Sequence, residues 1–217
     1  MTEVSATYTI KRPAWAHLPV SVDLETVGLD FDAPVFAIGA VRFTEDGSPL
    51  PEGCPGEFYR LINLRGQAPV EISTLYWWLQ QSPEAQAELK LSEKAASVRE
   101  VLTDFHGWLN AGNPMRGPGD PLAKFEGDLW ARGDRDSAWL ENLYKRVAGF
   151  DIPYRYNKVQ NQRTLLEFAE RHMNMDVWVE RDTPMHHALH DAHYQAKCLQ
   201  RVFKRYPNLE HILDQQE

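Results

Sequence analysis

The sequence predicts an α/β protein in which a five-stranded sheet is flanked by helices. Three strand-like segments joined by short turns come first, and helical and strand-like segments then alternate. Short turns between sequential strands indicate an antiparallel meander, and the later alternation places helices against the sheet. With 217 residues, 43% of them hydrophobic, the chain is long enough for a single domain with a substantial core.

The three early strands are identified by their patterns of apolar residues. Apolar and polar side chains alternate within residues 18–28, which is the period-two pattern of a strand. A long apolar run predicts a second strand over 34–44, and residues 57–63 predict a third. We expect residues 1–17 to form an N-terminal extension to a domain over 18–217.

Helical periodicity, interrupted by two strand-like segments, predicts the remaining elements. A fourth strand is expected over 123–130 and a fifth near 152–156. The last helix has the clearest pattern, because its apolar residues recur on one face. The expected helices cover residues 73–80, 83–90, 93–110, 134–148, 163–172 and 189–206.

Composition narrows the class of protein. The N-terminus lacks a basic start followed by an apolar core, and no apolar run approaches the length of a membrane span. Cys54 and Cys198 form no metal-ligand motif, so we expect a reducing, cytoplasmic location. The net charge is −8, but residues 131–206 hold 13 Lys and Arg against 10 Asp and Glu. Charge therefore does not decide whether the partner is a polyanion.

Asp23 and Glu25 lie two residues apart in the first expected strand, so both carboxylates point to the same face. Neighbouring carboxylates repel, and burial of either one unpaired is costly, whereas a divalent cation stabilises the pair. The alternative is a strand end with a solvated acidic edge. Taken alone, the pair favours that alternative.

A second polar cluster opens the last expected helix, where residues 186–193 contain four histidines and Asp191. His186 and His190 have the spacing of a zinc pair, although the glutamate of the zinc-protease helix is missing. His190-Asp191 also matches the dipeptide of metal-dependent His-Asp phosphohydrolases. A third interpretation is a surface cluster in which Asp191 caps the helix.

Together the two clusters resemble the motifs of the DEDD superfamily of 3′–5′ exonucleases, in its histidine-bearing (DEDDh) branch. The first motif is Asp23-Leu-Glu-Thr-Val-Gly28, and the third is His186-His-Ala-Leu-His-Asp-Ala192. Residues 74–81, Thr-Leu-Tyr-Trp-Trp-Leu-Gln-Gln, resemble the group that holds phage exodeoxyribonucleases and small bacterial exoribonucleases. The similarity spans roughly residues 20–200, nearly the whole chain.

The middle motif of this superfamily supplies one more aspartate. Asp136 is preferred, because a helical pattern follows it as the motif requires. Arg135 stands where an aromatic residue is usual, so Asp128 and Asp134 remain alternatives.

The resemblance implies a ribonuclease-H-like mixed sheet and two Mg²⁺ or Mn²⁺ ions held by four carboxylates, those of Asp23, Glu25, Asp136 and Asp191. Asp23 would bridge the ions, and His186 would accept a proton from the attacking water. On an ideal helix His186 and Asp191 lie about 140° apart. We therefore expect His186 on the loop before the helix and Asp191 in its first turn.

The resemblance also implies contacts with the 3′-terminal nucleotide. Adjacent helical residues point about 100° apart, so we expect one of two neighbouring tryptophans to stack on the substrate. The implied substrate-contacting residues are Thr26, Leu29, Phe36, Trp77 and Trp78, and the candidate phosphate contacts are Arg132, Arg135 and Arg163. We expect His187, His190 and His193 to be surface or packing residues.

The expected function is a metal-dependent 3′–5′ exonuclease that releases nucleoside 5′-monophosphates from single-stranded 3′ ends. RNA is favoured slightly over DNA, no membrane is involved, and similar proteins are often homodimers. Two other classes remain open. One is a noncatalytic nucleic-acid-binding module with the same fold, and the other is a zinc or His-Asp phosphohydrolase.

Overall fold

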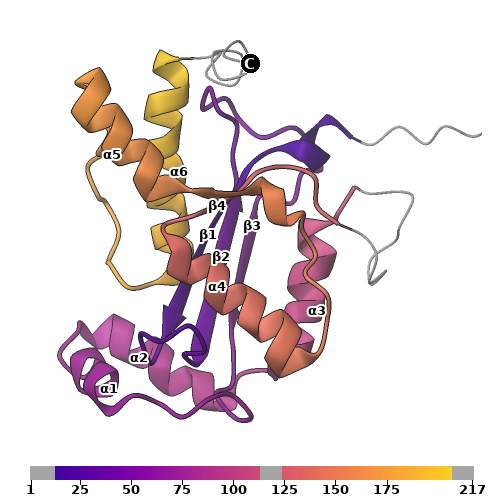
Figure 1. Ribbon diagram of the computed structural model, residues 1–217, viewed down its shortest axis with the longest axis vertical. Coiled ribbons are helices and arrows are strands. Elements are labelled where there is room, and N and C mark those ends of the chain that lie inside the picture. The colour runs from indigo at the N-terminus through magenta and orange to yellow at the C-terminus, as the bar shows by residue number, and fades with distance from the viewer. Residues whose placement is uncertain (1–12, 113–123, 207–217) are drawn as a thin grey trace, which may run out of the picture.

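The computed structural model describes residues 13–112 and 124–206. Its centre is a five-stranded mixed sheet with helices on both faces (Figure 1). The strands are β1 Val20–Thr26, β2 Val35–Arg42, β3 Glu57–Leu61, β4 Leu129–Ala131 and β5 Val159–Asn161, in the order β3-β2-β1-β4-β5. Strands β1, β2 and β3 are antiparallel, whereas β4 and β5 run parallel to β1. The predicted meander and α/β class are confirmed.

The helices match the expected ones with one exception. They are α1 Ile72–Trp78, α2 Pro83–Leu91, α3 Val98–Leu109, α4 Asp134–Asn142, α5 Gln162–Met173 and α6 Ala188–Arg205, with a π-helical stretch Leu143–Ala148 that continues α4. The single helix expected over 93–110 is wrong. Ser97 and Glu100 form a capping box that starts α3 anew after a short 3-10 turn, Ser92–Lys94.

The two late strands lie further along the chain than expected. Strand β4 overlaps only the end of the predicted segment 123–130, whose first residue lies outside the described residues. Strand β5 follows the predicted segment 152–156 instead of coinciding with it. The reason is that Phe125 and Tyr154 are buried and pair in one isolated bridge, so their apolar pattern imitates a strand without a ladder.

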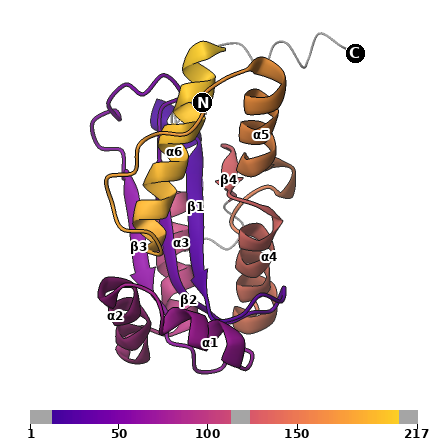
Figure 2. The same cartoon turned by 90° about the vertical axis from the view of Figure 1, so that its left-hand side faces the viewer.

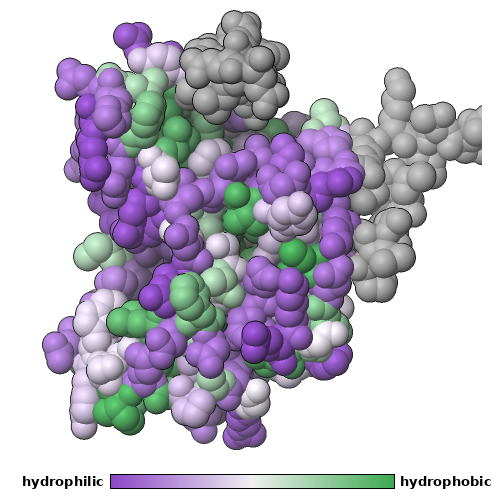
Figure 3. Space-filling model, in the orientation of Figure 1, coloured by the Kyte–Doolittle hydropathy of each residue, from purple (hydrophilic) through white to green (hydrophobic). Residues whose placement is uncertain are grey.

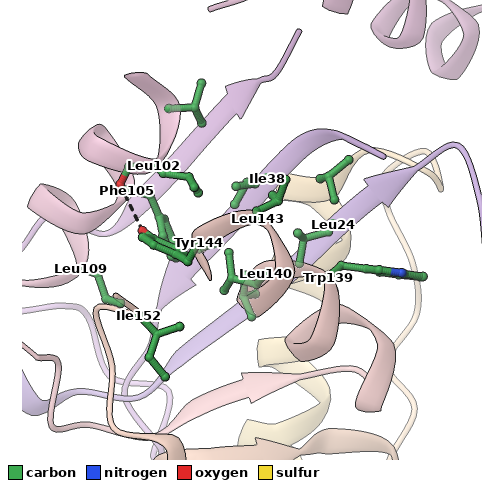
Figure 4. Close-up of a cluster of buried hydrophobic side chains, with 14 of the residues drawn as sticks. Leu24, Ile38, Leu102, Phe105, Leu109, Trp139, Leu140, Leu143, Tyr144 and Ile152 are labelled. Atoms are coloured by element: carbon green, nitrogen blue, oxygen red, sulfur yellow. Dashed lines mark hydrogen bonds between the residues drawn. The ribbon is translucent and has the colours of Figure 1, made fainter. Parts of the chain in front are cut away.

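The two faces of β1 are covered by different helices, and every residue of the strand is buried. Leu24 packs beside Ile38 against Leu140, Leu143 and other residues of α3, α4 and the π-helical stretch (Figure 4). Helix α6 lies along the opposite face, beside β1 (Figure 2). Acidic side chains on that second face are therefore enclosed between strand and helix.

Of the expected N-terminal extension, the structure describes residues 13–17, which include the 3-10 turn Ala14–His17, and residues 1–12 lie outside it. Its separation from a domain over 18–217 stays a prediction. Among the helices in the described part of the chain, none has the length and hydrophobicity that crossing a bilayer requires.

Candidate active site

Three carboxylates meet where the C-terminal half of β1 faces the first turn of α6. Asp23 and Glu25 come from the strand and Asp191 from the helix. One carboxylate oxygen from each lies within 4.8 Å of the others, and all three residues are buried. The strand periodicity that placed Asp23 and Glu25 on one face thus brings them to the start of the last helix.

This close approach depends on Gly39 of β2, which pairs with Asp23 across the ladder. A Cβ atom at Gly39 would lie 2.2 Å from both the carbonyl carbon of Ala188 and the backbone nitrogen of Leu189. A side chain at this position would push the first turn of α6 away from the sheet. An isolated glycine in a strand is a sequence signal for such backbone contact, and our sequence analysis missed it.

The environment of the carboxylates opposes their negative charge. Burial raises the pKa of Asp23 well above its usual value, and the charges of Asp136 and Asp191 raise it further. Burial, followed by the charge of Asp23, likewise raises the pKa of Glu25. Glu25 Oε1 is buried without a hydrogen-bond partner in the described part of the chain. An unpaired buried oxygen beside two more carboxylates is the environment that a bound cation would stabilise.

Asp136 lies in the first turn of α4, beside this three-carboxylate group but not within it. It is buried, and burial raises its pKa from 3.8 to about 6. The two alternatives have partners elsewhere. Asp128 Oδ1 is 3.4 Å from Lys158 Nζ, and Asp134 Oδ1 accepts a hydrogen bond from Asn161 Nδ2 at 2.7 Å. Of the three aspartates, Asp136 is the one whose charge raises the pKa of Asp23.

His186 lies on the loop immediately before α6, as the helical geometry predicted. Its φ of +64° is in the left-handed region, which non-glycine residues rarely adopt. The backbone N–H of His186 donates to Asp191 Oδ2 at 3.4 Å. Burial lowers the pKa of the half-buried ring, which favours the neutral form of the imidazole that can accept a proton.

The two neighbouring tryptophans differ in exposure. Trp78 is only 2% exposed, packs edge-on against Phe36 and donates to the Thr26 carbonyl at 2.8 Å. Trp77 is 42% exposed, and its ring centroid lies 4.8 Å from that of His186. Trp77 is therefore the one available for stacking on a substrate.

The other residues expected to contact a nucleotide also differ in their exposure and contacts. Phe36 is fully buried and packs edge-on against Trp78, so it presents no surface to a nucleotide in this structure, and the expected contact stays a prediction. The Thr26 hydroxyl donates to the Gly28 carbonyl at 2.9 Å. Leu29, in contrast, is 65% exposed.

The remaining histidines contribute no ligand to the carboxylate group. The rings of His187 and His190 stack with centroids 3.9 Å apart, and His187 also stacks on Tyr59. His193 Nε2 lies 2.8 Å from Glu57 Oε1. In the described part of the chain, the one group of three or more residues able to hold a metal consists of carboxylates alone.

Two residues that our sequence analysis missed contact the carboxylates. Gln195 Nε2 donates to Asp23 Oδ1 at 2.5 Å, and Arg181 Nη1 lies 2.5 Å from Asp191 Oδ1. A polar residue on the inward face of α6 is a signal for the first. Arg181 lies in an irregular segment without periodicity, so no signal marks it.

The three candidate phosphate contacts are arranged differently. The positive charge of Arg132 acts on Asp23, Asp136 and His186. Arg135 donates to the Leu29 carbonyl, and the Arg163 side chain is exposed. Of the three arginines, Arg132 is therefore the one whose charge acts on the carboxylates of the site.

A family model described as the 3′–5′ exoribonuclease Rv2179c-like domain matches residues 19–203. No curated protein sequence matches the chain. Among solved structures, E. coli exonuclease I in complex with a dT13 oligonucleotide has a TM-score of 0.61 and 11% sequence identity over 90% of this chain. The chain spans 43% of the length of that protein.

Two further structures match over most of both chains. The nuclease domain of 3′hExo, a DEDDh family member bound to rAMP, has a TM-score of 0.57 and 14% identity, covering 89% of this chain and 94% of that one. S. pombe Pop2p in its Mg²⁺- and Mn²⁺-bound form has a TM-score of 0.54 and 14% identity, covering 88% and 85%. These similarities confirm the expected ribonuclease-H-like exonuclease fold.

Proposed function

This chain belongs to the family of Rv2179c-like 3′–5′ exoribonuclease domains, and on that premise we propose that it removes nucleotides from single-stranded 3′ ends of RNA in a metal-dependent reaction. The observation that carries the proposal is the buried group of Asp23, Glu25 and Asp191, with Asp136 beside it and His186 at its edge. The family description favours RNA over DNA as the substrate.

The residues present fit divalent cations. Carboxylate oxygens suit hard ions such as Mg²⁺ and Mn²⁺, and Glu25 Oε1 is buried without a protein partner among the described residues. Asp23, Glu25, Asp136 and Asp191 would hold two such ions. When bound, the ions supply Lewis-acid activation and neutralise charge that develops at the scissile phosphate. S. pombe Pop2p, which shares the fold, has been solved with both Mg²⁺ and Mn²⁺.

His186 supplies the proton acceptor. Burial lowers the pKa of its ring, which favours the neutral form that can take a proton from the attacking water. The hydrogen bond from its backbone N–H to Asp191 Oδ2 holds the loop that carries the ring beside the carboxylate group. The ring contacts with Trp77 and Trp78 limit its rotation.

Trp77 and Leu29 provide the surface for the 3′-terminal nucleotide. Hydrophobic side chains gather near α1 at the lower end of the face shown in Figure 3. The exposed apolar residues of α1 and of the loop after β1 are Leu29, Phe31, Ile72, Tyr76 and Trp77. Aromatic stacking accepts any base, which suits an exonuclease without sequence preference. Trp78 supports this surface from below rather than forming it.

The proposal is tested by incubating 5′-labelled single-stranded RNA and DNA of the same sequence with Mn²⁺, Mg²⁺ or EDTA. We expect a ladder that shortens from the 3′ end, faster for RNA, absent in EDTA and absent with Asp23→Ala. Binding of RNA without cleavage under either metal would instead indicate a noncatalytic module. Zinc retained through purification, with activity that survives Asp23→Ala, would indicate a zinc or His-Asp phosphohydrolase.

A further inference from the structure

Gln195 connects the last helix to the first carboxylate of the site. It lies on α6 one turn after Asp191 and is 3% exposed. Its side-chain Nε2 donates a hydrogen bond to Asp23 Oδ1 at 2.5 Å. Asp23 and Gln195 are 172 positions apart in the chain. This contact therefore forms only when α6 is docked on β1.

A second contact fixes which end of the amide faces the carboxylate. The Ser21 hydroxyl, two residues before Asp23 on the same face of β1, donates to Gln195 Oε1 at 3.4 Å. The carbonyl end of the amide is thereby directed toward Ser21, which leaves the N–H₂ end for Asp23. An ionised carboxylate accepts hydrogen bonds only, so a donor is the group that it needs.

A hydrogen bond that does not involve Asp23 holds the backbone of Gln195 in place. Its carbonyl oxygen accepts a hydrogen bond from Gln162 Nε2 at 2.8 Å, and Gln162 is buried at the start of α5. The amide is thus presented to Asp23 from a fixed turn of helix.

We propose that Gln195 is a positioning residue for the metal site: its amide fixes the rotation of the Asp23 carboxylate and keeps the second oxygen available for a divalent cation. The inference rests on the proposed function, because it assigns Gln195 a role in the same site. Partners that orient a metal ligand typically change metal affinity by about 10- to 100-fold when removed.

The test uses Gln195→Met, which keeps the length of the side chain and removes the donor. Binding of Mn²⁺ is measured without RNA, by electron paramagnetic resonance of the free ion. We expect the Mn²⁺ dissociation constant to rise by about 10- to 100-fold. In the RNA assay, the Mn²⁺ concentration for half-maximal rate should rise by a similar factor, the KM for RNA should stay unchanged, and saturating Mn²⁺ should restore the rate.

Gln200→Met is the matched control. Gln200 is half-buried on the same helix, and its Nε2 donates to the Thr44 carbonyl at 2.8 Å, away from the carboxylates. We expect this variant to bind Mn²⁺ as the wild type does. Thermal denaturation of both variants separates a loss of stability from a loss of metal affinity.

The inference is overturned if Gln195→Met binds Mn²⁺ within about twofold of the wild type while Asp23→Asn binds it much more weakly. If Gln195→Met fails to fold, Ser21→Ala decides, because it leaves the core intact and removes only the hydroxyl that orients the amide. Weaker Mn²⁺ binding by Ser21→Ala supports the inference, and unchanged binding overturns it. A wild-type protein that binds Mn²⁺ but leaves RNA intact would contradict the proposed function, and the binding comparison would still test Gln195.

Discussion

Asp23 on β1 lies directly opposite Gly39 on β2 in the antiparallel ladder. The first turn of α6 fills the space that a side chain at Gly39 would occupy. We expect Gly39→Ala to destabilise the fold by about 1–3 kcal/mol, the usual effect of overpacking. It should also reduce exonuclease activity, because Asp191 would move away from Asp23. Chemical denaturation and the RNA ladder assay measure the two effects.

Gly107→Ala is the control for that substitution. Gly107 lies in α3, and an added Cβ would meet no atom within 4 Å. Alanine is the better helix former, so this variant should be at least as stable as the wild type. Wild-type stability and activity in Gly39→Ala would show that α6 does not require the close contact.

Trp77 and Trp78 should respond differently to alanine. Trp77→Ala removes a half-exposed ring, so we expect a small stability change and a KM for RNA raised about tenfold or more, since stacking contributes about 1–3 kcal/mol per base. Trp78→Ala leaves a cavity beside Phe36 and should cost about 3–5 kcal/mol. Denaturation and steady-state kinetics of both variants make the comparison. An unchanged KM in Trp77→Ala would exclude it from substrate binding.

Asp136 should make the metal-free protein less stable as the pH rises. Its pKa is about 6 in the folded protein and 3.8 ordinarily, so the stabilisation is complete below pH 3.8 and is lost as the pH passes through about 6. Two pKa units correspond to about 3 kcal/mol at most. In EDTA, the stability of wild type relative to Asp136→Asn should therefore fall between pH 4 and pH 7. If the stability of wild type relative to Asp136→Asn stayed constant or rose between pH 4 and pH 7, the raised pKa of Asp136 would be contradicted.

Arg181 should matter most when no metal is bound. Its partly buried guanidinium pairs with the buried Asp191, and loss of one partner from a fully buried pair costs about 3–5 kcal/mol, which is the upper bound here. We expect Arg181→Gln to lower stability in EDTA, and to lower it less with saturating Mn²⁺, because the cation then neutralises Asp191. Thermal denaturation under both conditions measures the difference.

Arg171→Gln is the comparison for Arg181. Arg171 forms an exposed pair with Glu167 at 2.9 Å, which contributes about 0–1 kcal/mol. This variant should behave alike with and without Mn²⁺. If Arg181→Gln lost equal stability in EDTA and in saturating Mn²⁺, the Arg181–Asp191 pair would stabilise the fold independently of the cation.

The predictable parts of this fold depend on local geometry. Period-two alternation placed Asp23 and Glu25 on one face, and the angular spacing of a helix placed His186 before α6 and Asp191 within it. Both arguments use the near neighbours of a residue in the chain. The start of α3 at Val98 also had a local signal, because Ser97 and Glu100 have capping-box spacing. The apolar periodicity over 93–110 nevertheless favoured one uninterrupted helix.

The parts that could not be predicted depend on contacts between distant segments. The resemblance implied that Phe36 contacts a nucleotide, but no sequence pattern indicated that Trp78, from another element, packs edge-on against it in the interior. Arg181 reaches Asp191 from an irregular segment whose course no periodic pattern describes. The last strand was placed too early, because the burial of Tyr154 beside Phe125 produces the same apolar pattern as a strand. Sequence patterns indicate which side chains are buried, but they do not identify the distant residues against which those side chains pack.

The most direct test of the central claim is to digest single-stranded RNA with Mn²⁺ in water enriched in ¹⁸O and to identify the products by mass spectrometry. We predict nucleoside 5′-monophosphates released from the 3′ end, each with one ¹⁸O atom in its phosphate, and none from His186→Asn at comparable times. Attack of water on phosphorus requires that label. Nucleoside 3′-monophosphates, cyclic phosphates or unlabelled 5′-monophosphates would contradict the account.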